Sequence, residues 1–424
     1  MEPSSIGISL SPVQITVDQN RMQRELAALA SLSDAPPPAV TRIVFSAMDL
    51  KARAYLDGIF SDAGLVVRKD RAGNTFARWI GSEPELPVVG TGSHADAIPF
   101  AGSYDGTVGL LGGLEAIRAL QRAGFRPRRS IELLMFTSEE PTRFGIGCLG
   151  SRLLSGALPP ERARLLKDSA GKSLEEVLEA AGFTGSLDDV PLPEDYYHAF
   201  VELHIEQGPL LERQKIPIGI VTSIAAPATL RLEIEGEGGH AGAMLMPDRR
   251  DAFLAAAEIA LGVESAAKST GSIDSVATVG VCNVFPGAVN SVPSRTVVEI
   301  DVRDTDLARR DAMLEKIRGT YEAISAKRKV RILETPVNAD APAQSSRFVV
   351  EALRASCAAA GLESMLMVSR AYHDSLFVAR IAPQAMLFIP CRNGYSHRPD
   401  EYAAPEDITA GVQVLAQTLA HLSE

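Results

Sequence analysis

Five side chains that could bind divalent metal ions lie in or shortly after short apolar runs of the sequence. They are His94, Asp105, Glu140, His204 and His397. Such runs, bounded by glycine or proline, are typical of buried strands, and open α/β sheets build their sites on the loops beyond the strands. Imidazole and carboxylate groups without sulfur suit Mn²⁺, Zn²⁺, Co²⁺ or Ni²⁺. The pattern therefore indicates an α/β sheet that carries a site for two divalent ions.

Each of these residues also has an ordinary structural interpretation. From Asp105 onward the apolar residues take a helical spacing, so Asp105 stands where a helix would be capped. A single histidine in a strand or loop is more often packed or solvated than bound to a metal. Glu139 and Glu140 repel each other, and both stay ionised only where solvent or a cation neutralises them. The metal site is favoured because all the potential ligands occupy comparable positions.

A series of longer motifs resembles the M20-type dinuclear metal amidohydrolases and peptidases, in the branch that cleaves carbamoyl and ureido groups. In chain order the matching segments are GSHADAIPFAGSYDG, FTSEEPTRFGIGCLGSR, ELHIEQGP, GGHAGA, GAVNSVPS, EIDVRD, RAYHDS and IPCRNGYSHRP. They run through nearly the whole chain, so the series is far more specific than any single motif. Two features resemble most the members that act on ureidoglycolate. One is Pro141, since allantoate and carbamoyl-amino-acid hydrolases usually carry glycine at this position, and the other is the segment SRAYHDSLF.

The resemblance implies how the five ligands divide. Asp105 would bridge two metal ions. His94 and His204 would complete one metal position, and Glu140 and His397 the other. The resemblance favours Mn²⁺, with Zn²⁺, Co²⁺ and Ni²⁺ as alternatives.

The resemblance also assigns residues outside the ligand set. Glu139 would be the general base, which takes a proton from the attacking water and returns it to the leaving nitrogen, and Asp96 would orient a metal-bound imidazole. His240 would stabilise the oxyanion, reaching across a dimer, while Asn290 and Arg303 would hold the substrate carboxylate. Without the motifs, the last two would be a turn asparagine and a surface arginine. Three further residues would line the pocket: Gln207, Tyr372 and His373.

The elements that must position these residues predict two domains. A chain of 424 residues is too long for one small core. After residue 221 the pattern becomes strand, helix, strand, strand, helix, strand, which is the order of a ferredoxin-like α+β unit. We expect an α/β catalytic domain with a mixed central sheet, residues 1–221 and 337–424, interrupted by a lid and dimerisation domain, residues 222–336. An insertion of this kind explains how His397 can rejoin His94.

Composition limits the partners and the compartment. Against 42 Lys and Arg stand 53 Asp and Glu, and this net charge of −11 argues against a nucleic-acid or anionic-membrane surface. No apolar run approaches the ~20 residues that span a bilayer. The first residues lack the pattern of a signal peptide, so we expect a cytoplasmic protein, or one of the endoplasmic reticulum if a leader has been removed.

The resemblance implies metal-dependent hydrolysis of the ureido C–N bond of (S)-ureidoglycolate, to glyoxylate, carbon dioxide and ammonia, in purine catabolism. We expect a homodimer that takes this small ureido acid as substrate. Allantoate and N-carbamoyl-L-amino acids are the alternative substrates. A non-catalytic dimerisation scaffold on the same fold is the alternative from a different class, and it is disfavoured because all five ligands and the base are present.

Overall fold

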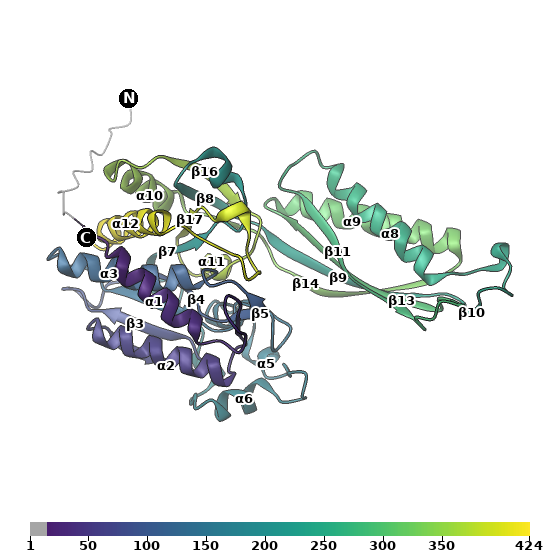
Figure 1. Ribbon diagram of the computed structural model, residues 1–424, viewed down its shortest axis with the longest axis horizontal. Helices are drawn as coiled ribbons and strands as arrows, with labels where there is room; N and C mark the ends of the chain where they lie inside the picture. The colour runs from purple at the N-terminus through teal and green to yellow at the C-terminus, as the bar shows by residue number, and fades with distance from the viewer. Residues whose placement is uncertain (1–14) are drawn as a thin grey trace. The chain divides into compact units, whose positions relative to one another are not determined.

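The structure, a computed structural model, describes residues 15–424, which form two compact units. Among these residues, unit 1 contains 15–222, Ser345–Met367 and His373–Glu424, and unit 2 contains Ser223–Gln344 and Val368–Tyr372. Figure 1 shows the elements of both. Among residues 15–424, no helix combines the length and apolar composition needed to cross a bilayer. The expected role of residues 222–336 as a lid stays a prediction.

Unit 1 is built on a mixed sheet. Its strands are hydrogen-bonded in the order β2 (Val66–Lys69), β3 (Thr75–Trp79), β6 (Ile131–Phe136), β4 (Val88–His94), β7 (Tyr197–Ile205), β17 (Gln384–Ile389) and β8 (Ile218–Ile224). The four central strands β6, β4, β7 and β17 are parallel, whereas β2, β3 and β8 pair in the antiparallel sense. The strand β16 (Ser364–Ser369) pairs with β8, and β1 (Val40–Arg42) pairs with β5 (Ala97–Ala101). The strand β15 (Ala343–Gln344) belongs to unit 2 and pairs with the last two residues of β8, Ser223 and Ile224, which belong to the same unit. The expected α/β fold with a mixed central sheet is confirmed.

Helices cover both faces of this sheet (Figure 1). The larger core packs against α1 (Gln19–Ser31), α2 (Ala47–Asp62), α3 (Thr107–Arg122), α10 (Arg347–Ala359) and α12 (Pro405–Leu422), and the smaller against α4 (Leu149–Leu154) and α6 (Leu174–Ala180). In β6, Leu133 and Met135 belong to the larger core, whereas Leu134 and Phe136 belong to the smaller. Because both faces are covered, the parallel strands β6 and β17 are largely apolar in sequence, whereas β4 (VVGTGSH) is apolar only at its start. The short helices of the unit are α5 (Pro160–Ala163), α7 (Leu210–Gln214), α11 (Asp374–Val378), η1 (Leu187–Asp189) and η3 (Arg392–Gly394).

Unit 2 has an antiparallel sheet in the order β11 (Val276–Phe285), β13 (Arg295–Asp304), β9 (Ala226–Glu235) and β14 (Arg331–Ala339). Its core packs against α8 (Ala252–Lys268) and α9 (Leu307–Arg328). Ion pairs between exposed or half-exposed side chains, such as Arg295 with Glu233 and Arg231 with Glu299, join neighbouring strands of the sheet. The chain order of strands and helices agrees with the ferredoxin-like unit expected from the sequence. Smaller elements are η2 (Met246–Asp248) and the paired strands β10 (Gly239–His240) and β12 (Ser291–Val292).

Two local details differ from what the sequence pattern indicates. Strand β4 continues to His94, so this histidine ends the strand and does not lie in the loop beyond it. Helix α3 is capped by Gly106, which has a φ of 64° and is preceded by Asp105, and no side chain makes a capping hydrogen bond there. The structure therefore excludes the interpretation of Asp105 as a helix cap.

Candidate metal centre

Parallel strands bring the predicted ligands to one edge of the unit 1 sheet. His94 ends β4, Glu140 follows the end of β6, and His204 is the next-to-last residue of β7. His397 lies in the loop that follows β17. Because the carboxyl ends of parallel strands meet at the same edge, residues far apart in the sequence gather there.

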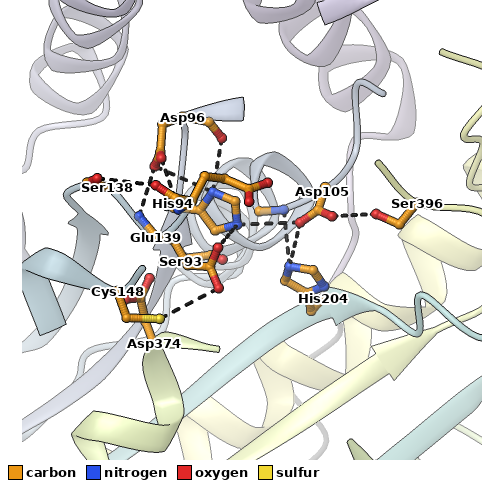
Figure 2. Close-up of polar contacts among 12 residues, drawn as sticks. Ser93, His94, Asp96, Asp105, Ser138, Glu139, Cys148, His204, Asp374 and Ser396 are labelled. Carbon is orange, nitrogen blue, oxygen red and sulfur yellow. Dashed lines mark hydrogen bonds and ion pairs between the residues drawn. The ribbon is translucent and has the colours of Figure 1, made fainter. Parts of the chain in front are cut away.

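The ligands form two groups that share Asp105. In the first group, Asp105 Oδ1 lies 3.4 Å from His94 Nε2 and 3.2 Å from His204 Nε2. In the second group, His397 Nε2 lies 3.4 Å from Asp105 Oδ2 and 3.3 Å from Glu140 Oε1. Figure 2 shows the side chains of Asp105, His94 and His204 turned toward one another. Each oxygen of one carboxylate therefore faces a separate group.

These separations fit divalent metal ions. Nitrogen and oxygen donors about 2.1 Å from an ion, at tetrahedral angles, lie about 3.4 Å apart. The Nδ1 atoms of His94 and His204 lie 3.1 Å from the Asp96 carbonyl oxygen and 2.9 Å from the Ile205 carbonyl oxygen. If each Nδ1–H donates there, the Nε2 lone pairs face Asp105. His94 Nε2 is buried and has no hydrogen-bond partner among residues 15–424, and a metal ion would satisfy it.

The charge of the site also favours cations. Hydrogen bonds to Asp105 and Glu140 raise the pKa of His397 to about 11. Burial alone would raise the pKa of Asp105, but the neighbouring imidazoles of His204, His397 and His94 hold that pKa well below its usual range. The carboxylates thus stabilise positive charge next to them, which divalent ions would supply.

Asp96 makes contacts that the sequence pattern does not reveal. Its backbone carbonyl oxygen lies closer to His94 Nδ1 than its carboxylate does, at 3.1 Å against 3.6 Å. The carboxylate instead accepts hydrogen bonds from the backbone N–H groups of Glu139, at 3.2 Å, and Glu140, at 3.1 Å. Asp96 therefore ties the end of β4 to the segment that carries both glutamates.

The Glu139 carboxylate lies beside the first group of ligands, as Figure 2 shows. Its Oε2 is 3.8 Å from His94 Nε2, and its Oε1 is 3.6 Å from the Sγ atom of Cys148, which is completely buried. Burial, reinforced by the charge of Glu140, raises the pKa of Glu139 well above its usual range. A carboxyl group with a raised pKa can both accept and return a proton near neutral pH.

Two of the predicted pocket residues lie at the ligands. Gln207 Nε2 donates a 2.6 Å hydrogen bond to Asp105 Oδ2. His373 is buried, with its ring centroid 4.5 Å from that of His204. Its neighbour Asp374 accepts a hydrogen bond from Ser151. The structure thus brings together with the ligands all the predicted site residues that belong to unit 1.

The remaining predicted residues belong to unit 2: His240, Asn290, Arg303 and Tyr372. His240 pairs with Ser291 between β10 and β12, and the Asn290 carbonyl oxygen accepts a hydrogen bond from the N–H of Ala241. The Arg303 guanidinium bonds Asp301 at 2.7 Å and lies 5.7 Å from the centre of the Tyr372 ring. Within unit 2, Arg303 therefore has Asp301 as an ion-pair partner. The contribution of all four residues to catalysis stays a prediction.

Sequence reasoning missed two residues of the site, Ser396 and Glu401. Ser396 Oγ donates a hydrogen bond to Asp105 Oδ2. Glu401 is only 5 % exposed and bonds the backbone at Asp105. The one available signal was proximity, since both lie within four residues of His397 in YSHRPDE.

A mixed α/β sheet whose strand ends bring imidazole and carboxylate groups into two adjoining triads, beside a buried carboxyl group, is typical of metal-dependent hydrolases. Residues 92–421 match the model of peptidase family M20/M25/M40, and the chain belongs to this family of hydrolases.

Proteins similar to this chain include two named hydrolases and one protein with a crystal structure. A ureidoglycolate hydrolase of Oryza sativa subsp. japonica is 54% identical over 414 residues, 96% of this chain and 85% of that protein. An N-carbamoyl-L-amino acid amidohydrolase of Geobacillus stearothermophilus is 36% identical, over 96% of this chain and 99% of that protein. The crystal structure of AtUAH in complex with glyoxylate is similar with a TM-score of 0.89 and 51% identity, covering 96% of this chain and 98% of the other.

Proposed function

We propose that this chain hydrolyses the ureido C–N bond of (S)-ureidoglycolate. Water attack would release carbamate, which decays to carbon dioxide and ammonia, and hydroxyglycine, which decays to glyoxylate and a second ammonia. The choice of substrate is supported by sequence identity. The chain is 54% identical to a ureidoglycolate hydrolase and 36% identical to a carbamoyl-amino-acid hydrolase. We place the reaction in purine catabolism, with nitrogen recovery as its role, and in the cytoplasm.

The ligands would hold two divalent ions, with Mn²⁺ favoured. His94 and His204 would bind one ion together with Asp105 Oδ1, and Glu140 and His397 would bind the other together with Asp105 Oδ2, as the distances of 3.2 to 3.4 Å allow. Bound ions would polarise the ureido carbonyl and lower the pKa of the attacking water.

Glu139 would move the proton. Its Oε2 atom lies on the His94 side and would take a proton from the attacking water, while Oε1 lies next to the Cys148 thiol. The same carboxyl group would then return the proton to the departing nitrogen, which leaves more readily as a neutral amine. Asp96 would hold Glu139 in place through the backbone.

The residues of unit 2 would recognise the rest of the substrate. Arg303 has the planar fork that binds a carboxylate in a bidentate manner, and its present partner, Asp301, is itself a carboxylate. Asn290 would assist it, and His240 would stabilise the oxyanion. Tyr372 and His373 would hydrogen-bond the substrate hydroxyl, which N-carbamoyl amino acids lack.

Removal of metal tests this proposal. Exhaustive chelation should abolish the release of glyoxylate from (S)-ureidoglycolate, and added Mn²⁺ should restore it, because the reaction depends on the ions to activate water. Glyoxylate would be measured together with metal content by elemental analysis. Full activity in a sample free of metal would rule out the proposed chemistry.

We also propose a homodimer formed through unit 2. Strand β11 is an edge of its sheet, with one side unpaired among the described residues. The neighbouring helix α8 exposes Leu254 and Leu261, which are 38% and 67% accessible. Unpaired strand edges and exposed apolar side chains are typical of association surfaces.

Leu261→Glu should convert the dimer to a monomer, because a charge would be buried without a partner in the interface. Leu307→Glu is a matched control, since Leu307 is an exposed leucine (43%) at the start of the other helix, α9. Sedimentation velocity would measure the mass of each variant. A wild-type protein that is monomeric and fully active would contradict both the dimer and the donation of His240 across it.

A further inference from the structure

Glu401 is a buried carboxylate that no step of the proposed reaction uses. Its Oε1 atom accepts hydrogen bonds from the backbone N–H groups of Tyr104, at 2.7 Å, and Asp105, at 3.1 Å. Its Oε2 atom lies 2.9 Å from Ser396 Oγ. One side chain therefore binds two segments that lie almost 300 residues apart in the sequence, of which one carries Asp105 and the other precedes His397.

The close fit of Glu401 against the Asp105 segment depends on Gly102. A Cβ atom added at Gly102 would overlap both the Cβ atom and the carboxylate of Glu401. Any other residue at this position would push the two segments apart. The carboxylate is thus held against the backbone by shape as well as by hydrogen bonds.

Ser396 connects Glu401 to the metal ligand itself. Its Oγ atom lies within hydrogen-bond distance of Asp105 Oδ2 and of Glu401 Oε2. A hydroxyl group has one hydrogen, so Ser396 can donate to only one of these oxygens at a time. Gln207 Nε2 also donates to Asp105 Oδ2, so hydrogen bonds orient this carboxylate on the side that faces His397.

His397 needs such an anchor more than the other histidines do. Its side chain is 46% exposed, whereas those of His94 and His204 are 1% and 0% exposed. It also lies outside any helix or strand, with a φ of 59°. Packing therefore fixes the first group of ligands, while the second depends on how the loop of His397 is attached to Asp105.

We propose that Glu401 is a positioning residue that assembles the second metal position by joining Asp105 to the loop of His397. The inference rests on the proposed function in one respect, namely that these two residues bind a metal ion. Hydrogen bonds to a carboxylate are stronger than neutral ones, and loss of such a supporting contact usually costs metal affinity about 10- to 100-fold.

The test is a titration of Mn²⁺ into metal-stripped full-length protein, followed by calorimetry, for wild type, Glu401→Ala and Ser396→Ala. Asp400→Ala is the matched control, because the neighbouring carboxylate is exposed and pairs only with Arg398 among the described residues. We expect both Glu401→Ala and Ser396→Ala to bind one of the two ions about 10- to 100-fold more weakly. Asp400→Ala should bind both ions as wild type does.

The melting temperature of each stripped protein separates metal positioning from simple loop stability. A lower melting temperature with unchanged affinity for both ions would overturn the inference, since Glu401 would then support only the fold. If Glu401→Ala does not fold, Glu401→Gln decides, because the amide keeps the shape of the side chain and one oxygen for the backbone N–H groups but loses the second acceptor that faces Ser396. Wild-type protein that binds no Mn²⁺ would overturn the metal assignment itself, so the two failures are distinguishable.

Discussion

Asp105→Ala should remove both metal ions and all hydrolysis together. Each of its two oxygens faces a different group of ligands, so no other single substitution should empty both positions. His204→Ala and His397→Ala should instead each weaken mainly one position. Elemental analysis would give the ions per chain, and glyoxylate release from (S)-ureidoglycolate would give the activity.

Near-normal content of one ion in Asp105→Ala would contradict the bridging role. The histidine variants are the matched controls, because each removes one ligand and leaves the shared carboxylate. If His204→Ala and His397→Ala lost the same ion, the division of the ligands into two positions would be wrong.

Glu139→Gln should keep the metal ions and lower kcat by about 10²- to 10⁴-fold, which is the usual contribution of a general acid or base. The amide has the same shape as the carboxylate but cannot take a proton from water. Glu140→Gln is the matched partner variant, with the same chemical change one residue along the chain, and it should lower metal content instead. Metal content and kcat would be measured on both.

Metal content in the two glutamate variants would also show whether the proposed roles are wrong. If Glu139→Gln loses metal while Glu140→Gln retains it, the roles of the two residues are reversed. Loss of metal from both variants would indicate that the Glu139 side chain is a ligand, in spite of its position 3.8 Å from His94 Nε2.

The sequence predicts the sheet, and the strand ends at which the proposed ligands lie, because both depend on local patterns. Apolar runs mark β6, β7 and β17, and the ligands follow from where these strands end. The motifs carried the resemblance to the M20 family, which the family match confirms. The order of strand and helix patterns after residue 221 also predicts an inserted α+β segment between the two parts of the catalytic chain.

Contacts between distant residues could not be predicted in this way. Asp96 bonds the backbone of Glu139 and Glu140, more than 40 residues away, and no periodicity encodes such a partner. A helical pattern after Asp105 favoured a cap, but Gly106 takes that position because its φ of 64° suits glycine. Glu401 lies in a charged, loop-like stretch, where sequence alone would predict a solvated side chain.

The most direct test of the proposed function is kcat/KM for the Mn²⁺-loaded protein on (S)-ureidoglycolate, allantoate and N-carbamoyl-L-amino acids. We predict a clear preference for (S)-ureidoglycolate, because a site whose buried polar groups bind a substrate hydroxyl strongly disfavours analogues that lack it. Allantoate should be disfavoured by its second ureido arm. A higher kcat/KM for allantoate or for a carbamoyl amino acid would contradict the proposed function.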